Sequence, residues 1–316
     1  MIEDISHNFN TNKSILCIMK IMVAEYAVGA GIPEFILEGR AMLGTLVRSF
    51  VSCDHEVMYP TSGMLLDTGT AVRTENFEDS ISRISKECDA GLVIAPDELL
   101  GDLTEIVEEN TVNLGCPSEA VRLCADKLEC TRALEKEKIP VPETIGSGDY
   151  SGNYVIKPRF GCASEGIRRS SSGVLQEGFI ATKFIEGEHL SASIITGKTQ
   201  LPLTVNKQLI EINDEISYKG GIVPYYCERN DEMIAVAKKT AKALGCRGYA
   251  GVDIVLGDMP YVVDVNPRPT TSIIGISRVM DEEIGNLILK SSFGELPGQV
   301  KITSAFTFKK DDLSGL

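Results

Sequence analysis

The chain has 316 residues, of which 43% are hydrophobic and 24% charged, a balance that excludes a disordered or fibrous protein and a single minidomain. Its net charge of −14 excludes nucleic acid as an expected partner, because no strong basic patch offsets the long-range repulsion. The most apolar N-terminal run, residues 15–24, is interrupted by Lys20 and falls short of the roughly 20 residues that a bilayer span needs, so no membrane anchor is expected.

Nine cysteines are scattered along the chain without a CxxC pair, which is typical of reduced thiols and predicts a cytoplasmic protein. Cys162 has no histidine near it in sequence and is expected to fill space rather than to act as a nucleophile. The oligomeric state stays open, a homodimer included. Residues 1–18 precede a second potential start at Met19 and are predicted to be a disordered extension.

The first folded region is predicted to span residues 19–117. A buried strand over 21–27 leads through a turn at Gly29 and Gly31 into a helix that begins at Pro33. Strands at 57–60 and 90–94, separated by a helix near 77–87, continue the alternation of strand and helix. This order predicts a small parallel sheet.

Two further regions are predicted, a central lobe over 118–188 and a C-terminal lobe over 189–316. In the central lobe one helix with an apolar stripe from 121 to 134 precedes strands at 154–156 and 179–185. In the C-terminal lobe strands at 191–196 and 201–205 precede a helix at 231–244, which Gly245 ends, and a hairpin from Tyr249 to Val265. The expected fold class is therefore α/β (α+β).

The hairpin carries the most informative pattern. Pairing Leu256 with Tyr261 across its turn places Asp253 opposite Asp264. Alternation then predicts one purely apolar face, made of Val252, Ile254, Leu256, Tyr261, Val263 and Val265. The other face gathers Asp253, Asp264 and Asn266, and such hard oxygen ligands suit Mg²⁺, with Mn²⁺ as the alternative.

Two solvated carboxylates on the wet side of a hairpin are the simpler interpretation of Asp253 and Asp264. The sequence that follows, Asn266-Pro267-Arg268, favours a ligand site instead. A guanidinium such as that of Arg268 binds a carboxylate or phosphoryl group through two parallel hydrogen bonds. We therefore interpret the hairpin as a platform for magnesium and phosphate.

A basic loop provides a second candidate site. Between Tyr154 and Ser170 four basic residues oppose one acidic residue, and Gly161 and Gly166 let backbone N–H groups approach an anion. An ordinary surface hairpin would have the same glycines. A P-loop is excluded, because Ile167 stands where that motif requires lysine.

Taken in order, these segments resemble the ATP-grasp superfamily of carboxylate–amine ligases. The resemblance rests on Asp126-Lys127, Val155-Ile-Lys157-Pro, the loop from Gly161 to Gly166, the segment Thr182 to Glu188, Asp253, and Asp264-Val-Asn-Pro-Arg268. It implies an ATP-grasp fold, in which two lobes clasp ATP behind a small N-terminal domain. One departure is Asp264, which stands where the family more often has glutamate.

The resemblance also implies roles for individual residues. Lys127 and Lys157 would contact the ATP phosphates, and the loop of Gly161, Ser164 and Gly166 would close over them. Lys183, Phe184 and Ile185 would line the adenine slot, and Glu188 would hold the ribose. The remaining implied residues are the metal ligands Asp253, Asp264 and Asn266. For the reaction itself we expect Arg268 to hold a reactive acyl phosphate, with Lys207 assisting.

A closer resemblance, to archaeal ATP-grasp ligases of methanofuran biosynthesis that couple tyramine to glutamate, extends over nearly the whole chain from Met19. It is carried by Leu37-Glu38-Gly39-Arg40, Asn206-Lys207-Gln208 and Asn266-Pro-Arg-Pro-Thr-Thr-Ser272, among other segments. It implies that ATP phosphorylates a glutamate carboxylate, which the amine then attacks. Lys207 departs from the expected arginine.

Two other functions stay open. One is an ATP-grasp amino-acid ligase with different substrates, and the other is a non-catalytic regulator that binds ATP. The retained carboxylates and Lys157 argue against the regulator, because a protein that had lost the reaction could also have lost its metal ligands by substitution.

Overall fold

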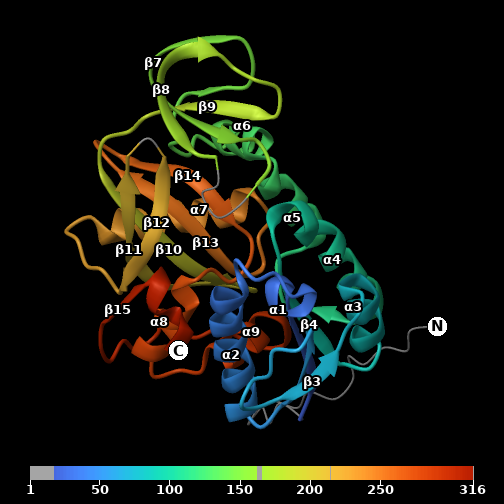
Figure 1. Cartoon of the computed structure of the whole chain (residues 1–316). Coiled ribbons are helices and arrows are strands. Elements are labelled where there is room, and N and C mark those ends of the chain that lie inside the picture. Colours follow the sequence, from blue (N-terminus) through green and yellow to red (C-terminus); the bar gives the residue numbers. More distant parts are fainter. Residues whose placement is uncertain (1–17, 162–165, 214, 316) are drawn as a thin grey trace.

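The computed structural model describes residues 18–161, 166–213 and 215–315. Apart from Ile18, the extension predicted for residues 1–18 lies outside this range, as do Cys162 and Ser164. Three sheets follow one another through the molecule, as Figure 1 shows, and the mixed α/β class is confirmed. No helix in the described part of the chain is long and apolar enough to cross a membrane.

The first sheet is parallel throughout, as predicted. Its strand order is β3-β2-β1-β4-β5. The strands are β1 (Lys20–Glu25), β2 (Glu56–Thr61), β3 (Thr70–Arg73), β4 (Ala90–Ile94) and β5 (Val112–Asn113), with helices α2 (Ile36–Ser52), α3 (Phe77–Ser85) and α4 (Asp97–Asn110). The carboxyl ends of β1 and β4, which are neighbours, therefore meet at one edge of the sheet.

The predicted strand over 21–27 ends two residues early. A short helix, α1 (Tyr26–Ala30), begins directly after β1, and the side chain of Glu25 caps it by accepting a hydrogen bond from Val28 N. Gly29 lies inside this helix instead of in a turn, and Gly31 ends it with φ 73°. A carboxylate that caps its own helix is thus fixed at the end of a buried strand.

The single helix predicted around the apolar stripe 121–134 is in fact two helices, α5 (Ser118–Ala125) and α6 (Lys127–Lys136). The chain breaks at Asp126, whose backbone is extended, with φ −84° and ψ 92°. Both helices bury one apolar face, so the periodicity runs through the break unchanged. The break places Lys127 at the first position of α6.

The second sheet is small and antiparallel, with strand order β6-β9-β7-β8, and it lies at the top of Figure 1. Its strands are β6 (Thr144–Ile145), β7 (Asp149–Pro158), β8 (Arg168–Val174) and β9 (Phe179–Lys183). A core of its own includes Tyr150, Tyr154 and Ile156. The strand predicted over 179–185 ends at Lys183.

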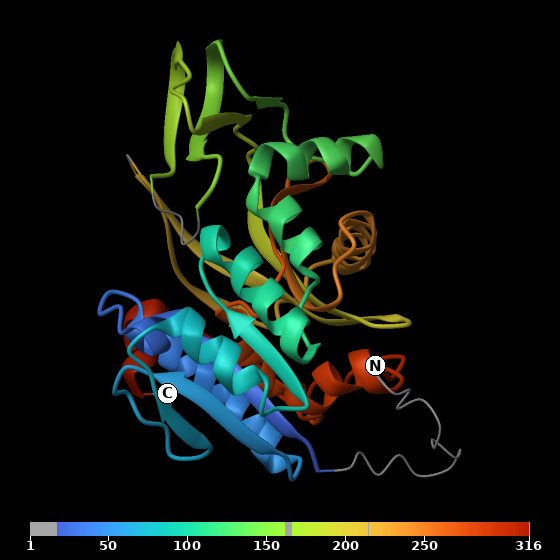
Figure 2. The same ribbon diagram turned by 90° about the vertical axis from the view of Figure 1, so that its right-hand side faces the viewer.

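The third sheet has six antiparallel strands in the order β14-β13-β10-β11-β12-β15. They are β10 (Glu188–Thr196), β11 (Gln200–Ile212), β12 (Ile216–Val223), β13 (Gly248–Leu256), β14 (Pro260–Asn266) and β15 (Phe306–Lys309). Helix α7 (Asn230–Ala243) covers one face, as Figure 2 shows. The strand predicted over 201–205 is thus part of a much longer one.

Helices α8 (Ser272–Val279) and α9 (Ile284–Phe293) join the third sheet to the first. Their apolar residues share one core with α2 and β1, in which Gly285 of α9 lies directly against Phe50 of α2. A 3₁₀ turn, η1 (Lys310–Gly315), closes the described chain beside α2. The domain boundaries at 118 and 189 stay predictions.

Candidate active site

The hairpin of β13 and β14 pairs Asp253 with Asp264, the register that the sequence predicts at this point. Beyond Asp253 the register shifts by one residue at a β-bulge, so that Ile254 pairs with Val262 and Leu256 with Pro260. The predicted pairing of Leu256 with Tyr261 is therefore wrong. An added residue in one strand is invisible to a count along the sequence.

The bulge moves Val263 to the side of the hairpin opposite to the one predicted. Val262 and Val265 lie in the core, whereas Val263 lines the cavity beside Asp264. The carbonyl oxygen of Val263 accepts a hydrogen bond of 2.7 Å from Nζ of Lys157. The bulge thus gives a buried lysine of the second sheet a backbone partner on the third.

The two facing carboxylates have different environments. Burial and the neighbouring charge of Asp264 raise the pKa of Asp253 to about 7. Its oxygens accept hydrogen bonds from Gln208 Nε2 at 2.9 Å and Asn266 Nδ2 at 3.3 Å. Burial also opposes the charge of Asp264, but the ammonium groups of Lys127 and Lys157 outweigh it and lower the pKa of Asp264.

A chain of alternating charges extends from Asp264 to the first sheet. Nζ of Lys127 lies 3.3 Å from Asp264 Oδ1 and 3.3 Å from Asp97 Oδ2. The other oxygen of Asp97 lies 3.6 Å from Nη2 of Arg268. Burial raises the pKa of Asp97, while Arg268 and Lys127 lower it. Lys127 and Lys157 therefore lie beside the carboxylate pair, and Arg268 is connected to Lys127 through Asp97.

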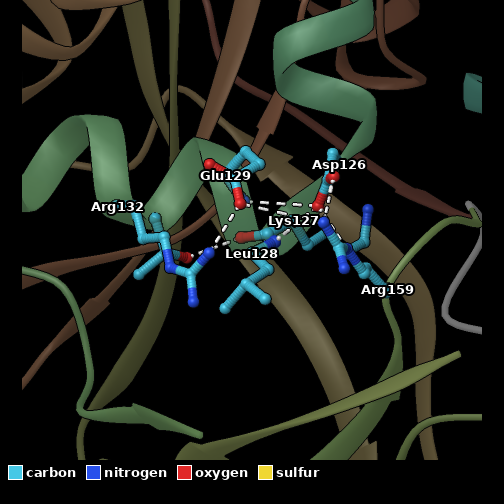
Figure 3. A network of polar contacts seen from close by, with 7 residues as sticks. Asp126, Lys127, Leu128, Glu129, Arg132 and Arg159 are labelled. Atoms are coloured by element: carbon cyan, nitrogen blue, oxygen red, sulfur yellow. Dashed lines mark hydrogen bonds and ion pairs between the residues drawn. The ribbon is translucent and has the colours of Figure 1, made fainter. Parts of the chain in front are cut away.

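Asp126, the residue before Lys127, makes a network of polar contacts, which Figure 3 shows. Its carboxylate binds the guanidinium of Arg159 through two hydrogen bonds, of 2.7 and 2.6 Å. The same carboxylate caps α6 by accepting hydrogen bonds from Leu128 N and Glu129 N, each of 3.2 Å. In addition, Lys127 N donates to the carbonyl oxygen of Arg159. One side chain thus joins the start of α6 to the end of β7.

Replacing Asp126 by alanine should destabilise the fold by about 1–2 kcal/mol, because the helix loses its cap and Arg159 its partner. Asp126→Asn should cost less, since an amide oxygen still caps the helix while the charged pair is lost. Thermal unfolding of both variants measures the difference. Equal stability of wild type and Asp126→Ala would contradict this role.

A cavity of about 420 Å³ opens at the carboxylate pair, within the range of about 300–1,000 Å³ that is usual for small-molecule sites. All three sheets contribute to its walls. The first sheet supplies residues after β1 and β4 together with one face of α2, the second supplies β7 and β9, and the third supplies strands from β10 to β14. Lys127, Lys157, Asp253, Asp264, Asn266 and Arg268 all line it.

The residues expected at an adenine slot line the same cavity. Thr182, Lys183, Phe184 and Ile185 form its wall at the end of β9. The guanidinium of Arg169 stacks 4.1 Å above the ring of Phe184 and fixes it. Gly161 also lines the cavity, and Gly166 lies close to Pro158 with φ 68°. Ser164, between these glycines, lies outside the described residues.

Glu188 and Lys207 are placed apart from this cluster. Nζ of Lys207 lies 3.0 Å from Glu188 Oε2, which also accepts a hydrogen bond of 2.8 Å from Tyr225. Lys207 pairs with Leu190 of β10, whereas Asp253 pairs with the next residue of that strand, Ser191. Because neighbouring residues of a strand point to opposite faces, the side chains of Lys207 and Asp253 lie on opposite faces of the sheet. The structure therefore does not bring Lys207 to the carboxylate pair.

Several polar residues of the cavity were not among the predicted site residues. Glu25 lines it from the end of β1, Gln208 from β11 and Tyr218 from β12. Asp97, at the start of α4, does not line the cavity but contacts two residues that do, Lys127 and Arg268. Burial raises the pKa of Tyr218 strongly. A usable signal existed for Glu25 and Asp97, because each follows a continuous apolar strand, and the carboxyl ends of parallel strands are common ligand sites. Gln208 and Tyr218 carry no such signal.

The donor set fits a hard divalent cation. Two carboxylates and the amide of Asn266 face the cavity, and Mg²⁺ prefers few protein oxygens together with phosphate oxygens. Among the described residues no group of three or more His, Cys, Asp or Glu side chains forms a complete metal cage. Burial and the neighbouring charge of Asp264 raise the pKa of Asp253, so a bound cation would favour its ionised form.

Comparisons with known proteins give the same family for both halves of the chain. Residues 47–121 match the pre ATP-grasp 3 domain family, and residues 124–272 match the ATP-grasp domain family. A tyramine–L-glutamate ligase from Methanocaldococcus fervens is 31% identical over 291 residues, which cover 87% of this chain and 94% of the relative. The ligase of that name from Methanocaldococcus jannaschii is 29% identical, over 89% of this chain and 92% of its own length.

Solved structures extend the agreement to the fold. A protein from Archaeoglobus fulgidus assigned to the ATP-grasp superfamily matches with a TM-score of 0.79 at 31% identity, over 92% of each chain. An N5-carboxyaminoimidazole synthetase from Staphylococcus aureus, complexed with ADP, has a TM-score of 0.70 at 16% identity over 94% of this chain and 83% of its own, a likeness of fold alone. The predicted ATP-grasp fold is confirmed, and with it an ATP-dependent, ADP-forming carbon–nitrogen ligase. The chain belongs to the ATP-grasp superfamily.

Proposed function

We propose that this ligase joins the side-chain carboxylate of L-glutamate to the amine of tyramine through an acyl phosphate, as a step of methanofuran biosynthesis. The names of the two Methanocaldococcus relatives, which align over most of this chain, support both substrates. One observation carries the chemistry. A single cavity holds the Asp253–Asp264 pair together with the cations of Lys127, Lys157 and Arg268.

Activation of the carboxylate is the first step that these residues serve. A free carboxylate is a poor electrophile, and transfer of the γ-phosphoryl group of ATP supplies a leaving group. Lys127 and Lys157 would contact the phosphates, and the fixed positions of their ammonium groups offset charge without reorganisation. Asp253, Asp264 and Asn266 would hold Mg²⁺, which when bound supplies further positive charge to the phosphates.

Arg268 would hold the acyl phosphate. Its guanidinium is largely buried, and its Nε has no hydrogen-bond partner among the described residues. A buried donor without an acceptor costs free energy, so a ligand oxygen at this position would satisfy it. Asp97, 3.6 Å from Nη2, orients the side chain without occupying Nε.

The nucleotide would lie against β9. Lys183, Phe184 and Ile185 would surround the adenine, and the loop from Gly161 through Ser164 to Gly166 would cover the phosphates. Glu188, which the resemblance implied for the ribose, contacts Lys207 and Tyr225 and does not line the cavity, so it has no role in this proposal.

A panel of carboxylates and amines tests the proposal, with ADP release and the mass of the amide as readouts. ADP should be released in stoichiometric amounts only when glutamate and tyramine are both present, together with an amide of their combined mass minus water. Turnover with another pair, such as two amino acids, would replace the substrates but keep the ligase. ATP binding without any product would favour the non-catalytic regulator.

A further inference from the structure

One face of α2 lines the part of the cavity that the nucleotide and metal residues do not use. Glu38, Gly39 and Met42 of α2 and Phe35, the residue before the helix, recur at helical spacing and all line it. Tyr218 of β12 lines it too. This half of the cavity therefore combines aromatic and aliphatic walls with carboxylates. Such a lining suits a ligand that joins a cationic group to an apolar body.

Glu25 carries the carboxylate that is least neutralised in this half. The residue is 5% exposed, and its Oε2 accepts a hydrogen bond of 2.8 Å from Val28 N. Within the described residues no lysine, arginine or histidine forms an ion pair with it. The backbone of α2 approaches it closely, because a Cβ at Gly39 would lie 2.2 Å from Glu25 Oε2. A side chain at position 39 would overlap the carboxylate of Glu25, so glycine is needed there.

Glu38, the neighbouring acid, is already engaged. Nζ of Lys310 lies 2.9 Å from its Oε2, and the hydroxyl of Thr271 donates to its Oε1. The other charged group that influences Glu25 is Arg268, which faces it from the segment after β14. Glu25 therefore lies in the same cavity as the guanidinium proposed for the acyl phosphate.

We propose that Glu25 binds the nitrogen of the amine substrate and accepts its proton, while the aryl group of that amine packs along α2 against Phe35 and Met42. This assignment rests on the proposed function. The second substrate is accordingly an arylalkyl amine, since glutamate offers no group for the apolar walls. Burial supports the role, because it raises the pKa of Glu25 to about 7, near the working pH that suits a general base.

The step balances with the groups present. The Glu25 carboxylate removes one proton from the bound ammonium group, and the freed lone pair forms the C–N bond at the acyl carbon. The C–O bond to the phosphate breaks, and its electron pair leaves on the phosphate together with the second proton from nitrogen. No further reactant is needed.

Hydroxylamine separates the two halves of the reaction, because it is small, is uncharged at neutral pH and traps an acyl phosphate as a hydroxamate without an amine site. Glu25→Gln should lower amide formation from tyramine about 100-fold or more, the usual contribution of a general base. Hydroxamate formation from glutamate and ATP should fall less than about threefold in the same variant. Glu34→Gln, an exposed glutamate of the same region, is the matched control.

The pH profile adds a readout that a structural role would not move. In wild type, kcat for the amide should fall below about pH 7, and Glu25→Gln should lose this limb. Glu25→Asp, which retracts the carboxylate by one methylene, should raise KM for tyramine without changing KM for glutamate. An equal loss of amide and hydroxamate in Glu25→Gln would overturn the assignment, as would a raised KM for glutamate. Absence of hydroxamate in wild type would overturn the proposed function and this assignment with it.

Discussion

Asp264→Asn should lower kcat for magnesium-dependent ADP release about 100- to 1,000-fold, the range found when one preorganised group is removed from a polar active site. Asp264 faces the cavity, and both Lys127 and Lys157 lower its pKa, so it is ionised at neutral pH and ready to bind a cation. The amide has lost this charge. Initial rates of ADP release over a range of Mg²⁺ concentrations measure the effect.

The fold should tolerate this change, because both lysines keep a partner. Lys127 remains 3.3 Å from Asp97, and Lys157 remains bonded to the carbonyl oxygen of Val263. Asn266→Ala should show a loss of the same order if the amide is a ligand. Asp258→Asn, in the exposed turn of the same hairpin, is the control and should keep wild-type rates. Near-normal turnover in Asp264→Asn would remove the hairpin from the mechanism.

The central part of this site could be predicted from the sequence because it depends on local rules. Two strands joined by a short turn pair with a register that can be counted, and alternation then assigns faces. The count places Asp253 opposite Asp264 correctly although it starts from a wrong pair, Leu256 with Tyr261, because the bulge adds one residue between the two points. The count fails where the bulge adds Val263, and the contact between Val263 and Lys157 joins residues 106 positions apart.

The rest of the site depends on how the three sheets come together. The apolar periodicity of the sequence continues through Asp126, so it does not reveal the break between α5 and α6. The break accompanies a contact between Asp126 and Arg159, which is distant in the sequence. Glu25 pairs with Ile94, three residues before Asp97, because β1 and β4 are neighbours in the first sheet, and no local pattern specifies that pairing. Lys207 was predicted near the acyl phosphate, and one step of strand alternation places it on the other face.

Asp253→Asn should stabilise the ligand-free protein while it abolishes ADP release. The pKa of Asp253 is raised to about 7 in the folded protein, against about 4 in an unfolded chain. Between these values the unfolded chain loses the proton and the folded protein keeps it, so stability falls as the pH rises. The full penalty, about 2–4 kcal/mol, is present above pH 7 and absent below pH 4.

Thermal or denaturant unfolding without Mg²⁺ at pH 5 and pH 8 measures this difference. The variant should be more stable than wild type at pH 8 by about 2–4 kcal/mol, and the gap should narrow at pH 5. Asp258→Asn, exposed in the same hairpin, should change stability by less than about 0.5 kcal/mol at either pH. A variant less stable than wild type at pH 8 would show that Asp253 supports the fold. The predicted result would instead mean that the chain keeps two facing carboxylates at a cost in stability, which selection for structure alone would have removed.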